Sequence, residues 1–173
     1  MSNLSAADMK KGVVAASAGN HAQGVALAAR KLGIKAVIFM PETTPVIKVN
    51  AVRSYGAITK LVGDSYDDAY QAASDYCEEK GSVFIHPYDD PDIIAGQVTI
   101  GFDILKQHKS LHEMIFVPVG GGGLIAVLAV YVKNLCPNIP IISLEPDHAD
   151  AMTKSLEAGR RVRLTEVVIL ADR

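Results

Sequence analysis

The feature that most constrains the fold of this chain is its regular alternation of short apolar runs with stretches of helical periodicity. Apolar runs of strand length occur at residues 12–17, 36–40, 58–62, 83–85, 114–119 and 139–144. Segments with helical spacing lie between and after them, at residues 22–32, 45–55, 65–80, 91–107, 124–135 and 150–158. Apolar strands that alternate with helices are typical of parallel sheets covered on both faces. We therefore predict an α/β fold with parallel sheets and flanking helices.

The break at residues 87–92 predicts two lobes. We expect residues 12–88 to form a small Rossmann-like lobe and residues 89–173 to form part of a larger one. The chain enters its first strand after one short polar stretch and ends on an apolar run at residues 167–170. We interpret both ends as cuts through a larger fold that is incomplete at either side.

Composition excludes several classes of partner. The formal net charge of −2 gives no broad attraction to nucleic acid or to an anionic membrane surface. No apolar run approaches the roughly 20 residues of a membrane span, and the first residues contain no apolar signal region. Cys77 and Cys136 lie far apart and have no metal-binding spacing, so we expect free thiols. These features predict a cytoplasmic protein that contacts neither nucleic acid nor membrane.

The first candidate site is Ser-Ala-Gly-Asn-His-Ala-Gln-Gly at residues 17–24, where a strand ends and a helix begins. Ligands of open α/β sheets bind at the carboxyl ends of strands, and a helix N-terminus offers free N–H groups to an anion. Gly19 allows close approach of the backbone, and Asn20 supplies an amide donor and an acceptor. This composition suits a carboxylate beside a polar ring atom. The alternative is an ordinary turn capped by Ser17 or Asn20.

The second candidate site is a run of four glycines that also joins a strand to a helix: Gly120, Gly121, Gly122 and Gly123, followed by Leu124. Ordering four glycines is conformationally costly, and bare N–H groups at a helix start suit a phosphate. No Gly-Lys-Ser/Thr follows, so the run is not a P-loop. Ile125 occupies the third glycine position of the dinucleotide fingerprint. We favour phosphate binding without an adjacent lysine over a flexible turn.

Other polar residues give weaker signals. His21 lies in a first helical turn, where it either caps the helix or faces the site, and His86 is interpreted as structural. Surface positions are expected for His108, His112 and His148. No histidine lies at zinc spacing from a cysteine or carboxylate, so no metal is predicted. Glu145 follows the sixth strand, where a cation site is one interpretation and a solvated loop carboxylate is the commoner one.

Together the two glycine-rich segments resemble the asparagine loop and the phosphate loop of threonine and serine dehydratases. These enzymes belong to the tryptophan-synthase-β-like (fold type II) pyridoxal phosphate class, which includes serine racemase. Residues 46–48 and 94–97 are also similar, and the resemblance covers about residues 4–172. It implies pyridoxal 5′-phosphate as cofactor and deamination of L-threonine or L-serine to 2-oxobutanoate or pyruvate plus ammonia. It further implies a place in isoleucine biosynthesis and a homo-oligomer.

The resemblance also implies roles for individual residues. Asn20 would hydrogen-bond the phenolic oxygen of the pyridoxal ring. Ser17, Asn20 and the backbone of three further residues would hold the substrate carboxylate, namely Ala18, Gly19 and His21. The cofactor phosphate would be bound by Gly120, Gly121, Gly122, Gly123 and Leu124. Racemases of this class carry a second serine at the position of Ala18, and alanine cannot transfer a proton, so dehydration is favoured over racemisation.

Several departures from the family pattern bear on activity. The Ser-Phe-Lys motif that forms the Schiff base is expected before the first residue, and no lysine of this chain lies in such a motif. The residue that faces the pyridine nitrogen is expected beyond Arg173. Val98 replaces a usual glycine, where it would crowd the helix or the site, and Ala151 stands where the racemase cation site has a carboxylate.

We therefore expect no catalytic residue in this chain and no useful dehydratase turnover from it alone. General acid–base groups typically contribute about 10²–10⁴-fold to the rate, and the covalent step is lost as well. Three alternatives stay open at this point: a non-catalytic fragment that binds pyridoxal phosphate or phosphate, a serine racemase-like enzyme, and a dinucleotide-binding domain.

Overall fold

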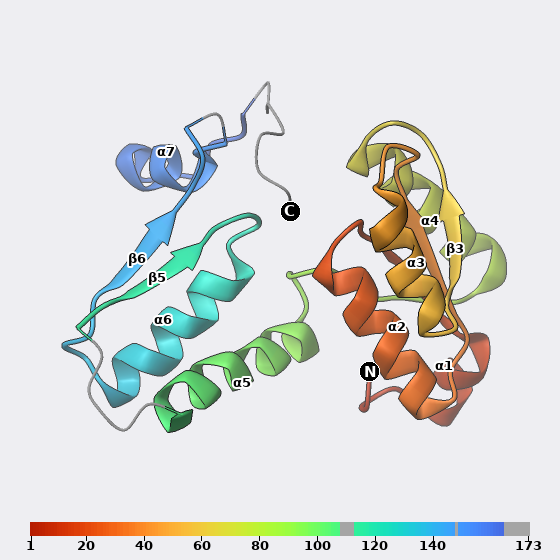
Figure 1. Ribbon diagram of the computed structural model, residues 1–173, viewed down its shortest axis with the longest axis horizontal. Coiled ribbons are helices and arrows are strands. Elements are labelled where there is room, and N and C mark those ends of the chain that lie inside the picture. The colour runs from red at the N-terminus through yellow and green to blue at the C-terminus, as the bar shows by residue number, and fades with distance from the viewer. Residues whose placement is uncertain (108–112, 148, 165–173) are drawn as a thin grey trace. The chain divides into compact units, whose positions relative to one another are not determined.

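The computed structural model describes residues 1–107, 113–147 and 149–164 (Figure 1). The chain divides into two compact units, Met1–Pro87 and Tyr88–Arg173. Every strand and helix expected from the periodicity is present, with bounds that differ by at most two residues. In chain order the elements are α1 (Ala6–Lys11), β1 (Val13–Ala16), α2 (Asn20–Leu32), β2 (Ala36–Met40), α3 (Val46–Ser54), β3 (Ile58–Leu61), α4 (Tyr66–Lys80), β4 (Val83–Phe84), α5 (Pro91–Gln107), β5 (Ile115–Pro118), α6 (Gly123–Leu135), β6 (Ile141–Leu144) and α7 (Ala151–Ala158).

The first unit is built on a four-stranded parallel sheet with strand order β3-β2-β1-β4. Val13 of β1 pairs with Ala36 of β2 on one side and with Val83 of β4 on the other. The chain therefore winds outward from β1 in both directions, and the strand order reverses beside β1. Ligands of open α/β sheets bind at such a reversal, outside the carboxyl ends of the strands.

Both faces of this sheet are covered by helices. Because successive strand residues point to opposite faces, β1 and β2, which are buried at every position, contribute to two apolar layers. Helix α4 covers one face, while α2 and α3 cover the other (Figure 1). The core beneath α4 consists of Val14, Ala16, Val37, Phe39, Ala69 and Ala73. Burial on both faces explains why β1 and β2 are continuous apolar runs rather than alternating ones.

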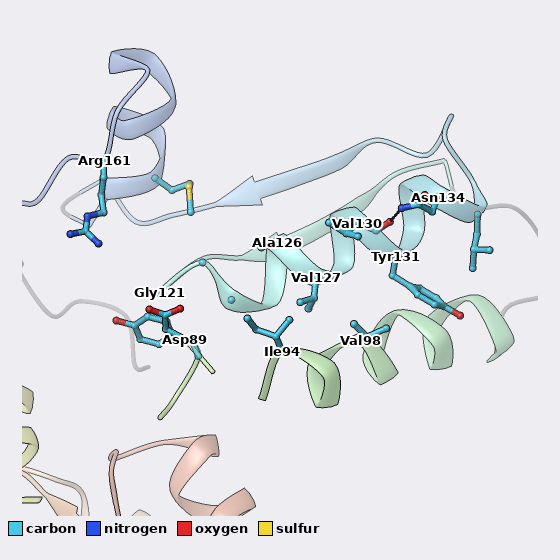
Figure 2. Close-up of a pocket in the computed structure, with 15 residues that line it drawn as sticks. Asp89, Ile94, Val98, Gly121, Ala126, Val127, Val130, Tyr131, Asn134 and Arg161 are labelled. Atoms are coloured by element: carbon cyan, nitrogen blue, oxygen red, sulfur yellow. Dashed lines mark hydrogen bonds between the residues drawn. The ribbon is translucent and has the colours of Figure 1, made fainter. Parts of the chain in front are cut away.

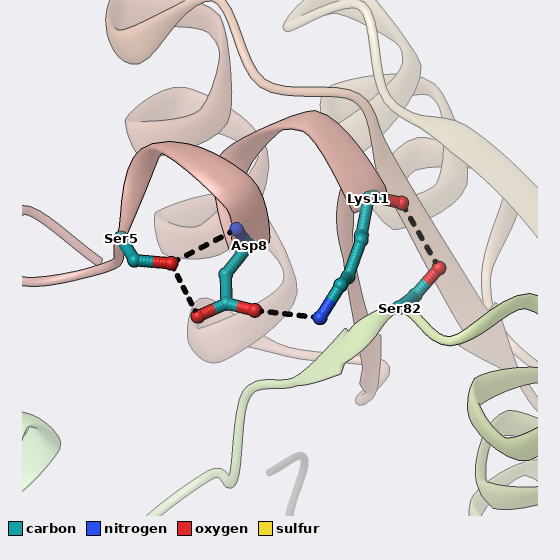
Figure 3. Close-up of polar contacts among 4 residues, drawn as sticks. All are labelled: Ser5, Asp8, Lys11 and Ser82. Atoms are coloured by element: carbon teal, nitrogen blue, oxygen red, sulfur yellow. Dashed lines mark hydrogen bonds and ion pairs between the residues drawn. The ribbon is translucent and has the colours of Figure 1, made fainter.

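Helix α1 was not foreseen from the sequence, because it buries no residue and has no apolar stripe. Polar contacts hold it instead (Figure 3). The Ser5 hydroxyl oxygen accepts the Asp8 N–H at 3.1 Å, and the Lys11 ammonium pairs with the Asp8 carboxylate at 2.9 Å. Hydrogen bonds from Ser5 and the charge of Lys11 lower the pKa of Asp8. The Ser82 hydroxyl donates to the Lys11 carbonyl at 3.2 Å, which ties the end of α1 to the start of β4.

The second unit contains a parallel pair of strands, β5 and β6, with α6 packed on the pair and α5 packed on α6 (Figure 1). Val117 is buried, whereas Phe116 and Leu144 are 55% and 50% exposed. One face of the pair is thus open, unlike the covered inner strands of the sheet in the first unit. Helix α5 is the longest helix described, and no described helix combines the length and hydropathy of a membrane span.

Candidate functional site

The loop after β1 leaves the sheet at the point where the strand order reverses. The Ser17 N–H still donates to the Phe39 carbonyl at 3.1 Å, and the Ser17 hydroxyl accepts the Gly19 N–H at 3.1 Å. Gly19 is the N-cap residue of α2, and no side chain caps this helix. Neither Ser17 nor Asn20 therefore caps α2. The first N–H groups of a helix have no intrahelical partner, so this helix start can receive an anion.

His21 lies in the first turn of α2 and connects it to the strand on the other side of β1. Its Nε2 atom donates to the Ile85 carbonyl at 3.0 Å, because a carbonyl can only accept. Ile85 follows β4 and continues the ladder by donating its N–H to the Val14 carbonyl at 2.8 Å. Burial of the ring lowers the pKa of His21, although the hydrogen bond to Ile85 opposes this shift. The neutral side chain thus fixes the start of α2 and leaves the backbone N–H groups for a ligand.

The lowered pKa of His21 predicts a pH dependence of stability. The unfolded chain protonates His21 near its ordinary pKa of 6.5, whereas the folded chain resists protonation to lower pH. The contribution of His21 to the free energy of unfolding is therefore fully present above pH 6.5. It is lost as the pH falls through the lowered folded pKa. His21→Gln keeps a donor for Ile85 and should flatten this decline. Urea midpoints at pH 7.5 and 5 measure this decline. His86→Gln should reduce it only slightly, because the charge of His86 is the smallest of the causes that act on His21. Equal declines in wild type and His21→Gln would contradict the prediction.

The glycine-rich loop follows β5 and leads into α6. The Val119 N–H donates to the Leu144 carbonyl at 2.9 Å, which extends the pairing of β5 with β6 by one step. Gly122 is the N-cap residue, with φ of 83° in the left-handed region, and no side chain caps α6. A simple turn would need only one residue with positive φ. In this loop, glycine N–H groups also precede a helix of 13 residues that no side chain caps. This arrangement suits a phosphate.

Glycine is required at several positions of this loop for steric reasons. A Cβ atom on Gly121 would lie 2.8 Å from the Tyr88 ring, and one on Gly123 would lie 2.9 Å from the Tyr88 Cβ atom. A Cβ atom on Gly122 would lie 2.8 Å from the Met152 Cε atom. Gly120 differs, because the space beside it contains no atom within 4 Å. The loop is therefore closely packed on one side and open at Gly120, which fits a group that approaches the backbone from that direction.

A cavity of about 790 Å³ extends from the glycine loop along α5 and α6 (Figure 2). Ile94 and Val98 of α5 point toward α6 there, where Val127 faces them (Figure 2). Val130, which is 66% exposed, lines the same cavity. Val98, which replaces the family glycine, thus lines the cavity. Arg161 also lines it and brings a positive charge. The sequence offered no signal for Tyr88 or Arg161, because neither residue lies in a glycine-rich motif.

The structure places the other residues that the sequence analysis singled out as follows. The residues predicted to bind substrate lie in the first unit, and those predicted to bind phosphate lie in the second. The last histidines, His108, His112 and His148, lie outside the described residues, as does the run at residues 167–170. Within residues 1–107, 113–147 and 149–164, no three His, Cys, Asp or Glu side chains gather as metal ligands.

Glu145 is not a solvated loop carboxylate, since it accepts hydrogen bonds from Met152 and Thr153.

Two loops thus each join a parallel strand to an uncapped helix, and one of them is a run of glycines. Such helix starts suit anions. Comparison with known proteins identifies the class: residues 1–173 match the family described as pyridoxal-phosphate dependent enzyme, and the chain belongs to that family. The family depends on pyridoxal phosphate, and its solved members share the tryptophan-synthase-β-like α/β fold. Membership sets aside the alternative of a dinucleotide-binding domain.

Individual relatives are more specific. The chain is 55% identical over 172 residues to a biosynthetic threonine dehydratase of Arabidopsis thaliana, and 50% identical over 175 residues to a biosynthetic L-threonine dehydratase of Burkholderia multivorans. Each alignment covers 99% of this chain but only 29% and 34% of those proteins. The structure of processed threonine deaminase isoform 2 from Solanum lycopersicum matches with a TM-score of 0.89 and 50% identity, over 96% of this chain and 46% of that one. The chain thus spans about a third of the relatives' length.

Proposed function

We propose that this chain is the part of a threonine dehydratase that binds the cofactor phosphate and the substrate carboxylate. The observation that carries the proposal is the glycine loop with its left-handed Gly122, which leads into an uncapped α6. The similarity to threonine dehydratases supports the choice of reaction. In the whole enzyme the reaction would convert L-threonine into 2-oxobutanoate and ammonia. L-serine as a second substrate, a homo-oligomeric state and a cytoplasmic location stay predictions from the sequence.

The proposed roles follow the two loops. The N–H groups of residues 120–124 would hold the phosphate, and Asn20 would donate to the phenolic oxygen of the ring. Ser17, Asn20 and the backbone of Ala18, Gly19 and His21 would hold the substrate carboxylate. Pyridoxal phosphate supplies an electron sink that stabilises charge at the α-carbon, so that the β-hydroxyl can leave. Ala18 has no group that could carry a proton to the opposite face, which favours dehydration over racemisation.

A second candidate function is binding of pyridoxal phosphate or phosphate without catalysis. The observation that favours it is the absence from the sequence of a lysine in a Ser-Phe-Lys motif. In that case both loops would bind their ligands, and the 173-residue chain would not deaminate threonine. The two candidates share the same phosphate site, so one binding experiment tests their common part.

Titration of the chain with pyridoxal 5′-phosphate, followed by borohydride reduction and mass mapping, tests this proposal. We expect a saturable complex that inorganic phosphate displaces, no lysine fixed by reduction, and no 2-oxobutanoate formed from threonine. Pyridoxal, which lacks the phosphate, is the matched control and should bind more weakly by a factor of about 10 or more, as expected for lost hydrogen bonds to a charged group. Absence of saturable binding would overturn the phosphate site. A stoichiometric adduct on one lysine would show that the chain carries its own Schiff-base residue.

A further inference from the structure

Glu145 holds the first turn of α7 from outside that helix. Its Oε1 atom accepts the Met152 N–H at 2.9 Å, and its Oε2 atom accepts the Thr153 N–H at 2.8 Å. The Thr153 hydroxyl also donates to Oε2, at 2.9 Å. Asp150, the N-cap residue, makes no side-chain cap hydrogen bond. Glu145 therefore satisfies helix N–H groups that a cap residue would ordinarily satisfy, and its charge is favourable at the positive end of the helix.

The helix that Glu145 holds is connected to the glycine loop through Met152. The Met152 Cε atom lies 2.8 Å from the point where a Cβ atom on Gly122 would stand, and both residues line the same cavity. The strand pairing also brings Glu145 near the glycine loop, because Pro118 at the end of β5 pairs with Leu144 at the end of β6. Glu145 follows Leu144 directly. A continuous set of contacts thus runs from Glu145 through the start of α7 to the residue that gives the loop its left-handed turn.

We propose that Glu145 is a positioning residue for the phosphate-binding loop, acting by fixing Met152 against Gly122. This inference rests on the proposed function of that loop. Both carboxylate oxygens of Glu145 are engaged by α7, so in this arrangement Glu145 stabilises the helix rather than a cation. Ala151, the first residue of α7, brings no carboxylate to such a site. Packing of Met152 beneath the loop restricts the directions of its N–H groups, which preorganises them for an anion.

Binding of pyridoxal 5′-phosphate to the full chain tests the proposal. Glu145→Ala removes three hydrogen bonds and should weaken binding roughly 10-fold or more. Met152→Ala leaves the cap intact and should weaken binding about 3-fold, since only packing is lost. The double variant should bind no more weakly than Glu145→Ala alone, because both changes interrupt one set of contacts. Asp147→Asn removes a charge two residues away, on an exposed side chain, and should leave the affinity unchanged.

A spectroscopic readout separates positioning from general loss of structure. The backbone amide NMR signals of residues 120–123, recorded without ligand, should shift in Glu145→Ala and Met152→Ala but not in Asp147→Asn. Glu145→Gln keeps one acceptor oxygen for the Met152 N–H and should recover most of the affinity. If Glu145→Ala does not fold, Met152→Ala and Glu145→Gln still decide the question.

Several results would overturn the proposal. These are unchanged affinity in Glu145→Ala, additive effects in the double variant, or glycine signals that do not move. A rise in wild-type affinity on addition of K⁺ or Mg²⁺ that Glu145→Gln abolishes would identify Glu145 as a cation ligand instead. If the wild-type chain binds no pyridoxal 5′-phosphate, the proposed function fails, while the glycine signals still show whether Glu145 positions the loop.

Discussion

Replacing Gly122 by alanine should destabilise the second unit and remove most of its affinity for pyridoxal 5′-phosphate. A side chain in the left-handed region costs about 1–2 kcal/mol, and the new Cβ atom would stand 2.8 Å from the Met152 Cε atom. Relief of that contact requires either Met152 or the loop to move. We expect the free energy of unfolding to fall by about 1–3 kcal/mol and binding to weaken at least 10-fold, as measured by urea titration and by absorbance.

Gly120→Ala is the matched control within the same loop. Gly120 has no positive φ, and a Cβ atom there meets no atom within 4 Å. Its effect on unfolding should stay within about 0.5 kcal/mol. Weaker binding by a stable Gly120→Ala chain would show that the phosphate approaches this open side of the loop. Equal loss of stability in the two variants would contradict the importance of the left-handed turn at Gly122.

Ile38→Ala should cause the largest loss of stability in the first unit, about 2–5 kcal/mol. Ile38 is fully buried in β2, where it pairs with Ala15 on one side and Thr59 on the other. The cavity that remains cannot collapse easily, because helices and strands surround the site on both faces of the sheet. The free energy of unfolding of a small domain is only about 5–15 kcal/mol in total. The variant should therefore unfold at a clearly lower urea concentration.

The same truncation on the neighbouring edge strand is the control for Ile38. Ile58 begins β3 and is 46% exposed. Ile58→Ala should cost about 1 kcal/mol or less, because much of its side chain already contacts water. Comparable losses for the two isoleucines would mean that the interior of the sheet is less closely packed than the structure indicates.

The order of strands and helices could be predicted from the sequence because buried parallel strands are short and continuously apolar. Glycine marked the loops, since only glycine allows both the turn at Gly122 and the close packing against Tyr88. The short helix α1 escaped prediction because local polar contacts of Ser5 and Asp8 specify it, rather than an apolar stripe.

Contacts between distant residues could not be predicted from local patterns. The hydrogen bond from His21 to Ile85 depends on the pairing of β1 with β4, which periodicity does not encode. The role of Glu145 depends on where α7 begins relative to β6. The open face that Phe116 presents could not be predicted from periodicity, which indicates a strand covered on both sides.

The position of β1 between β2 and β4 has a consequence for the order in which the first unit is completed on the ribosome. The pairing of β1 with β2 and of β2 with β3 joins segments that are synthesised close together. Val83, however, pairs back to Val13, and such long loops close slowly. The fourth strand and the Ile85 carbonyl that orients His21 therefore arrive last. Until residue 85 has emerged, one edge of β1 stays unpaired, and this edge can pair with other chains.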